Sequence, residues 1–94
     1  MDRLQRLIFS FYREDPRIES LLKPLQECHM SRSWGSIRLE CKDIEHLEKV
    51  CGLISYIRIP LASLGLGRQI VLRVPGSVQR TYSMNVPFHT DLIV

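Results

Sequence analysis

The stretch that decides the fold is residues 36–51, which reads SIRLECKDIEHLEKVC. Apolar and polar residues alternate from Ile37 to Cys41, as in a strand that buries one face. The spacing then changes to the three- and four-residue intervals of a helix, and Asp43 is suited to cap its first turn. We therefore expect a strand over 36–41 followed directly by a helix that ends at Gly52.

Two helices are expected ahead of this stretch, within residues 1–28. Apolar residues from Leu4 to Tyr12 recur at helical spacing. Asp15 followed by Pro16 is typical of a second helix start, because proline lacks only an N–H that the first turn leaves unbonded. Residues 29–35, HMSRSWG, show neither period and are expected to form a loop.

The segment after Gly52 is ambiguous. LISYIRI, residues 53–59, is rich in β-branched and aromatic residues and is bounded by Gly52 and Pro60, which favours a strand. Its apolar spacing would also continue the preceding helix. A short helix or turn is expected over 60–66, and RQIVLRV at 68–74 predicts a strand that turns at Pro75-Gly76 into another near 78–84.

These elements predict an α+β fold in one small domain. Two N-terminal helices and a third helix would pack on one face of a mixed sheet of 3–4 strands. We expect residues 1–94 to form a single unit. Its expected parts are a helical region over 1–28, a strand–helix–strand–strand core over 36–86 and an apolar tail over 87–94.

Composition narrows the class of protein. The chain has 94 residues, of which 45% are hydrophobic and 24% charged, as in ordinary globular domains. It has no apolar run long enough to span a bilayer and no signal-peptide pattern at its start. We therefore expect a soluble cytoplasmic protein that does not bind membranes.

The net charge of +3 is unevenly distributed. Acids and bases balance in residues 1–50, whereas Asp91 is the only acid after residue 50. An acid-free stretch of this kind can attract phosphates. If 53–59 is a strand, a basic and aromatic patch could form across neighbouring strands and bind RNA or single-stranded DNA, with candidate residues Tyr56, Arg58, Arg68, Arg73, Arg80 and Tyr82.

The cysteine and histidine pattern does not indicate a metal site or an enzyme. Cys41, His46 and Cys51 lie five residues apart, so on one helix they cannot converge on an ion. Buried structural thiols and a surface histidine are expected instead. We find no catalytic constellation and no cofactor motif, and Gly65 and Gly67 fit a turn better than a phosphate cradle.

Two features suggest a protein partner. Trp34, with Arg32 nearby, combines the two residue types that most often anchor interfaces, although Trp34 could equally pack onto the local core. The chain also ends in the apolar residues Leu92, Ile93 and Val94, which could pair with another chain. We expect a non-enzymatic regulatory or adaptor protein whose partner is another protein or a second copy of itself, as in a homodimer; nucleic-acid binding is the alternative.

Overall fold

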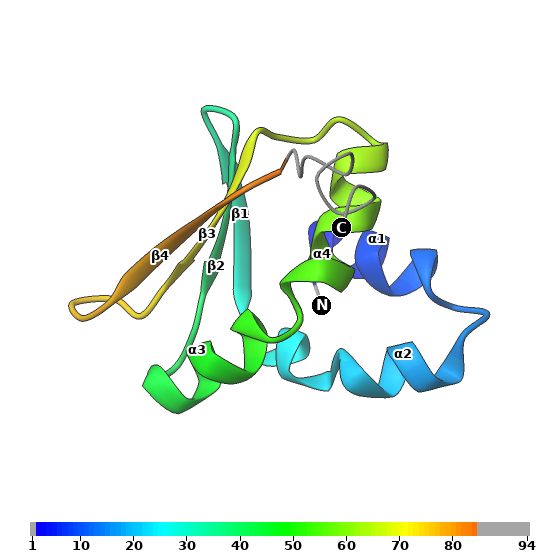
Figure 1. The fold of residues 1–94 in the computed structure, drawn as a ribbon, viewed down its shortest axis with the longest axis horizontal. Coiled ribbons are helices and arrows are strands. Elements are labelled where there is room, and N and C mark those ends of the chain that lie inside the picture. Colours follow the sequence, from blue (N-terminus) through cyan, green and yellow to red (C-terminus); the bar gives the residue numbers. More distant parts are fainter. Residues whose placement is uncertain (1, 85–94) are drawn as a thin grey trace, which may run out of the picture.

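The computed structural model describes residues 2–84, which form a four-stranded mixed sheet with helices packed on one face (Figure 1). The sheet order is β1-β2-β3-β4; β2 and β3 are parallel, and both outer pairs are antiparallel. The predicted α+β class and the mixed sheet are confirmed. The strands are β1 (His29–Ser33), β2 (Ser36–Glu40), β3 (Gln69–Arg73) and β4 (Gln79–Ser83).

The N-terminal region is helical, as predicted. It contains α1 (Arg3–Phe11), α2 (Pro16–Leu21) and a 3₁₀ helix, η1 (Lys23–Glu27). The Asp15 side chain accepts a hydrogen bond from the Ile18 amide and caps α2. Asp2 caps α1, and its second carboxylate oxygen accepts the Met30 amide at 3.2 Å, which ties the start of α1 to the outer strand β1.

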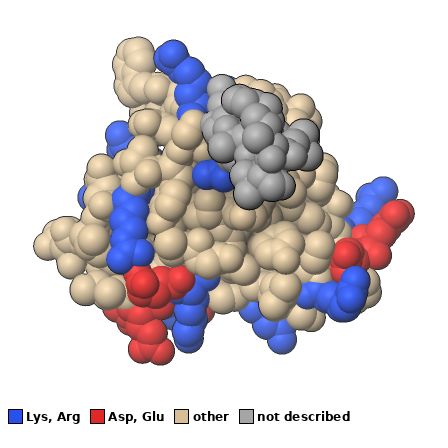
Figure 2. All heavy atoms as spheres, viewed as in Figure 1, with Lys and Arg blue, Asp and Glu red and all other residues tan. Residues whose placement is uncertain are grey.

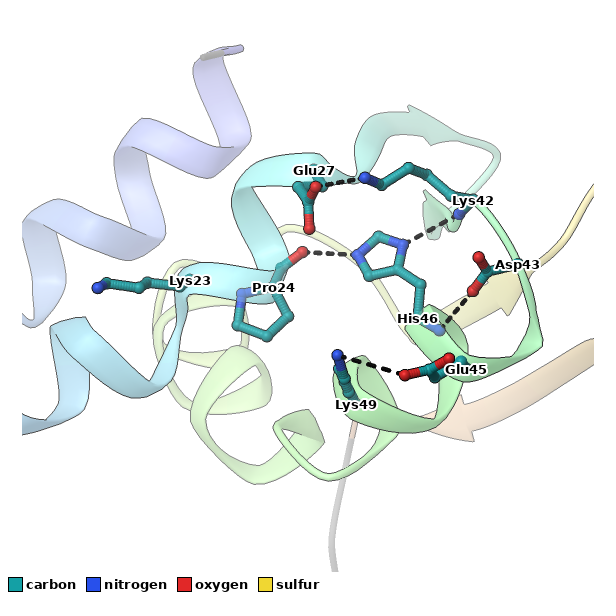
Figure 3. A pocket seen from close by; sticks show the side chains of 8 residues that line it. All are labelled: Lys23, Pro24, Glu27, Lys42, Asp43, Glu45, His46 and Lys49. Carbon is teal, nitrogen blue, oxygen red and sulfur yellow. Dashed lines mark hydrogen bonds and ion pairs between the residues drawn. The ribbon is translucent and has the colours of Figure 1, made fainter.

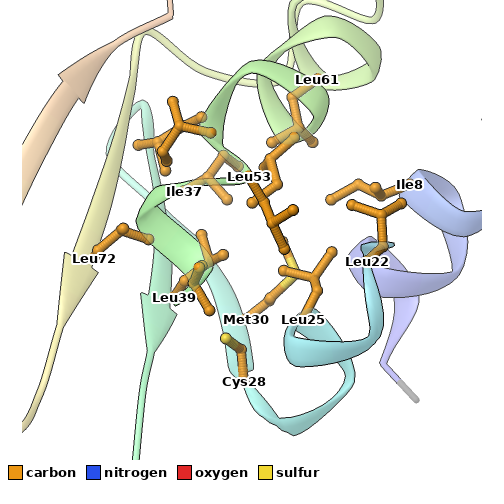
Figure 4. Packing of buried hydrophobic residues seen from close by; sticks show 14 of the residues in the cluster. Ile8, Leu22, Leu25, Cys28, Met30, Ile37, Leu39, Leu53, Leu61 and Leu72 are labelled. Carbon is orange, nitrogen blue, oxygen red and sulfur yellow. The ribbon is translucent and has the colours of Figure 1, made fainter. Parts of the chain in front are cut away.

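Two helices, α3 (Ile44–Cys51) and α4 (Ile54–Ser63), connect the parallel strands β2 and β3. They cover the same face of the sheet as α1 (Figure 1). The core lies between these layers (Figure 4), and side chains from every layer are completely buried in it, including Ile8, Leu22, Leu25, Ile37, Leu39, Leu47, Val50, Ile57, Leu61, Ile70 and Leu72.

The expected strand at 53–59 is wrong, because this segment belongs to α4. Gly52 keeps a right-handed helical conformation (φ −66°, ψ −11°), so the chain turns into a second helix instead of extending. The helical spacing of Leu53, Ile57 and Leu61 lets all three enter the core. Burial thus outweighs the strand preference of the β-branched residues.

The expected helix start at Pro60 is also wrong, since Pro60 lies inside α4. Proline has no N–H for the carbonyl four residues earlier, which is that of Tyr56. The Tyr12 hydroxyl donates to this carbonyl at 2.6 Å. Tyr12, the C-cap residue of α1, therefore supplies the hydrogen bond that α4 lacks and joins the two helices.

The expected loop over 29–35 is wrong in most of its length, because His29–Ser33 forms β1. Only Met30 of this strand is buried, so no alternating apolar pattern could be seen. Among residues 2–84, the structure has no helix that is both long enough and apolar enough to cross a membrane. The expected apolar tail, 87–94, lies outside the described residues.

Candidate functional site

Trp34 stands at the tip of the β1–β2 hairpin. The pairing of Ser33 with Ser36 leaves a loop of two residues, Trp34 and Gly35, with φ of 50° and 80°. Two left-handed residues in succession are typical of the turn that best fits the twist of a hairpin. Asparagine or aspartate usually occupies the first position, because a bulky side chain is strained there.

The Trp34 side chain does not pack onto the protein. It is 97% exposed, whereas the next most exposed large hydrophobic residues among those described, Ile44 and Leu64, are each at 55%. Of the two roles that the sequence left open for Trp34, the structure therefore contradicts packing onto the local core.

Hydrogen bonds fix the tip of the hairpin to the start of the neighbouring strand β3. The Gly35 carbonyl accepts hydrogen bonds from the backbone amides of Arg68 at 2.7 Å and Gln69 at 3.4 Å. The Gln69 side chain donates to the Ser36 hydroxyl at 2.8 Å. A Cβ on Gly67 would lie 3.0 Å from the Gly35 carbonyl oxygen, so a glycine is needed for this close approach. The loop is thus tied to the start of β3.

The surroundings of Trp34 are basic. Arg32 and Arg68 are both exposed, and neither forms an ion pair with a carboxylate within residues 2–84. A hollow of about 290 Å³ beside the ring is lined by Trp34, Gly35, Ser36, Arg68 and Gln69. In Figure 2 the acidic side chains gather at the lower and right edges, and only basic ones are seen towards the hairpin tip at the top.

The basic and aromatic residues expected to form one patch across neighbouring strands do not all lie on strands or on one face of the sheet. Tyr56 and Arg58 lie on α4, not on a strand. Arg80 and Tyr82 stand opposite the buried residues Leu72 and Ile70 on the helix-covered side of the sheet. Because alternate residues of a strand point to opposite faces, Arg73 lies on the other face.

Two members of that expected patch are also engaged within the fold. Arg80 forms an ion pair with Glu48, and the Tyr82 hydroxyl lies 2.7 Å from the Cys51 sulfur. Hydrogen bonds to Cys51 and Glu48 raise the pKa of Arg80, and the hydrogen bond to Cys51 raises that of Tyr82. These contacts connect β4 to α3.

A second cluster joins Cys28, Cys41 and His46, whose sulfur and nitrogen ligand atoms all lie within 4.8 Å of one another. All three residues are buried, so the expected surface histidine is wrong. Sequence spacing missed the cluster because each residue comes from a different segment: the end of η1, the end of β2 and the helix α3. Cys51 is not part of this group; its sulfur is hydrogen-bonded to the Tyr82 hydroxyl instead.

Hydrogen bonds with the backbone determine which nitrogen of the neutral His46 ring carries the proton (Figure 3). Its Nδ1 accepts the Lys42 amide at 3.0 Å, so in the neutral ring Nε2 carries the proton and donates to the Pro24 carbonyl at 2.8 Å. The ring borders a hollow of about 330 Å³ between η1 and α3, whose rim includes the ion pairs Lys42–Glu27 and Lys49–Glu45.

The buried surroundings of the Cys28 and Cys41 thiols disfavour the charged thiolate form. Burial raises the pKa of Cys28 strongly, and burial also raises that of Cys41. Both are therefore protonated at neutral pH, which does not favour their use as nucleophiles. The predicted burial of Cys41 on the apolar side of its strand is confirmed.

The remaining partner candidates, Leu92, Ile93 and Val94, lie outside the described residues. Their role in pairing between chains stays a prediction. Comparison of the chain with models of protein families, with curated proteins and with solved structures finds no match.

Proposed function

We infer that this protein is a non-enzymatic adaptor or regulator that binds another protein through the tip of its β1–β2 hairpin. Trp34 would be the anchor. The observation that carries this proposal is a fully exposed tryptophan in a left-handed backbone position. Strain at an exposed site that does nothing for packing suggests that the residue is retained for an interaction.

The energetic argument rests on the size of the indole. A tryptophan can bury roughly 150–250 Å² at an interface. At about 25 cal/mol per Å², that area corresponds to about 4–6 kcal/mol before the costs of association. The hydrogen bonds between Gly35 and β3 reduce one such cost, because the loop is already ordered before it binds.

The charges near the tip indicate the character of the partner. Arg32 lies two residues before Trp34 and Arg68 lines the hollow beside it, and neither forms an ion pair with a carboxylate of the described chain. A protein with an apolar pocket rimmed by acidic side chains would complement this surface. Nucleic acid fits less well, because the arginines and tyrosines expected to form its binding patch lie on different elements and faces.

Site-specific photocrosslinking tests this proposal. A photoreactive tryptophan analogue, which keeps the indole ring, is placed at position 34 and, as a control, at position 21, since Leu21 is an exposed apolar residue on α2. In extracts of the native cells, position 34 should give a protein adduct of discrete mass that nuclease treatment leaves unchanged. No adduct, the same adduct at both positions, or an adduct lost with nuclease would contradict the proposal.

A second copy of the chain would be a special case of the same proposal. Sedimentation of the purified protein over a range of concentrations distinguishes it from a different partner. If Trp34 binds another copy, the association should weaken in Trp34→Ala. If instead residues 92–94 pair between chains, their deletion should shift the protein to monomer while Trp34→Ala has no effect.

A further inference from the structure

Two thiols and an imidazole meet where η1, β2 and α3 come together. Cys28 ends η1 and donates its amide to the Leu25 carbonyl, while its own carbonyl accepts the Gln5 side chain at 2.7 Å. The Cys41 amide donates to the Arg73 carbonyl at 2.8 Å. His46 donates its amide to the capping carboxylate of Asp43. Each ligand residue is therefore fixed by its own backbone.

The pairing in the sheet brings the two thiols together. His29 pairs with Glu40 at the end of the β1–β2 ladder, so Cys28 and Cys41 occupy the next facing positions. α3 follows Cys41 after a short connection and places His46 over them. The Cys28 sulfur lies 3.9 Å from Nε2 of His46.

We propose that Cys28, Cys41 and His46 bind a zinc ion. Zinc takes cysteine sulfur at about 2.3 Å and histidine nitrogen at about 2.0–2.1 Å in a tetrahedral arrangement, which sets neighbouring ligand atoms roughly 3.6–3.8 Å apart. The Cys28 sulfur and Nε2 of His46, at 3.9 Å, are about 0.3 Å farther apart than the sulfur–nitrogen spacing of such a site. The ligand atoms that are up to 4.8 Å apart need to approach by about 1 Å, which side-chain rotation can provide.

The net charge of the occupied site and its access from solvent both suit a zinc ion. Two thiolates and one Zn²⁺ sum to zero, so the buried group carries no net charge. Calcium and magnesium prefer oxygen ligands and do not fit two sulfurs and an imidazole. The hollow between η1 and α3 is lined by His46 but by neither cysteine (Figure 3), so an ion would enter past the imidazole, and solvent from this side would supply the fourth ligand.

Binding would rearrange protons in a defined way. The two thiols release one proton each to solvent. The proton on Nε2 of His46 moves to Nδ1, because a neutral imidazole binds the metal through its unprotonated nitrogen. Nδ1 then no longer accepts the Lys42 amide, which must turn away and find another acceptor. Nε2 also gives up its hydrogen bond to the Pro24 carbonyl, which must move aside to admit the ion. The Lys42 amide is thus a reporter of occupancy.

The ion would crosslink two parts of the chain. It would join the helical N-terminal region, through Cys28, to the strand and helix that carry Cys41 and His46. Because the site requires the folded chain, zinc should stabilise the native state over the unfolded one.

Cobalt titration of the full-length protein, without an affinity tag and under anaerobic reducing conditions, tests the proposal. One equivalent of Co²⁺ should give thiolate-to-cobalt charge-transfer bands and intense tetrahedral d–d bands, and one equivalent of Zn²⁺ should remove both. Cys51→Ser is the matched control and should behave like the parent. Cys28→Ser and Cys41→Ser should each weaken Co²⁺ binding by more than about 100-fold, beyond the 10–100-fold typical of an outer-shell partner.

Measurements on the unmodified chain cover the case in which these variants fail to fold. Zinc should raise the melting temperature and shift the Lys42 amide resonance. Absence of charge-transfer bands at saturating Co²⁺ would overturn the proposal. So would a cobalt spectrum that is lost in Cys51→Ser.

Discussion

At Trp34 the backbone conformation favours a residue other than the tryptophan that is present. The hairpin turn needs a residue that accepts a φ of 50°, which asparagine does readily and tryptophan does not. The indole gains no intramolecular packing in return, since it is 97% exposed. A residue that served the fold would lose stability on replacement, whereas a residue retained for binding can gain it.

We expect Trp34→Asn to stabilise the protein. Relief of the left-handed strain should raise the free energy of unfolding by about 1 kcal/mol, which for a chain of this length raises the melting temperature by roughly 4–8 °C. Trp34→Ala is the control, because alanine keeps the backbone penalty and should change stability little. Urea unfolding of the three proteins gives the comparison; a clear loss of stability in Trp34→Asn would assign Trp34 a structural role.

Gln5 is the buried polar residue that fixes the start of the chain to the rest. Its side-chain amide donates to the carbonyls of Leu25 at 2.8 Å and Cys28 at 2.7 Å, and its oxygen accepts the Asp2 amide. Gln5→Met fills about the same space but removes these hydrogen bonds and leaves the Cys28 carbonyl without this donor, so we expect a loss of about 1–3 kcal/mol in urea unfolding. Gln26→Met, at an exposed neighbouring position, should cost little; equal losses would contradict this role for Gln5.

At the scale of elements, α4 depends on a hydrogen bond that α1 supplies. Pro60 leaves the Tyr56 carbonyl without its helical donor, and the Tyr12 hydroxyl replaces it. Tyr12→Phe should therefore cost about 1–2 kcal/mol. In a Pro60→Ala background the helix has its own N–H at this position, so the same substitution should cost much less. A double-mutant cycle measured by urea unfolding checks this, and equal costs in both backgrounds would contradict it.

The same hydroxyl gives a pH dependence. Burial is the main cause that raises the pKa of Tyr12 above its ordinary value of 10.0. A raised pKa in the folded state means that the stabilising contribution is complete below pH 10 and is lost as the pH rises through the raised value. The difference in unfolding free energy between the parent and Tyr12→Phe should accordingly shrink above pH 10. A difference that grows with pH would contradict the assignment.

Much of the element order could be predicted, and the failures have physical causes. The strand at 36–41 and the helix after Asp43 were predicted because each buries one regular face, and the strand at 68–74 because its β-branched and apolar run ends at Pro75-Gly76. β1 was missed since Met30 is its only buried residue. α4 was missed because its apolar residues suit either period, and contact with α1, which the sequence does not show, compensates for Pro60. The cluster of Cys28, Cys41 and His46 was missed because it exists only after three segments pack together.

At the scale of the whole molecule, the two proposed sites lie in different places on one scaffold. The Trp34 tip projects from the β1–β2 hairpin at one end of the sheet, and the thiol–histidine cluster lies at the other end of β1 and β2 (Figure 1). If the cluster binds zinc, the ion should stabilise the chain without altering binding through Trp34. We therefore expect partner affinity to be the same with and without zinc at a temperature where both forms are folded. A change of more than about tenfold would show that the two sites are coupled.

The most direct test of the central claim is the affinity of the purified crosslinked partner for the parent chain, Trp34→Ala and Leu21→Ala. Trp34 is the only tryptophan of the chain, so its emission reports on its own burial. With a partner that lacks tryptophan or carries a spectrally distinct analogue, the account predicts a blue shift on binding. It also predicts a loss of affinity of at least about 30-fold in Trp34→Ala, equivalent to roughly 2 kcal/mol, and none in Leu21→Ala. Binding that leaves the emission unchanged and tolerates Trp34→Ala would contradict it.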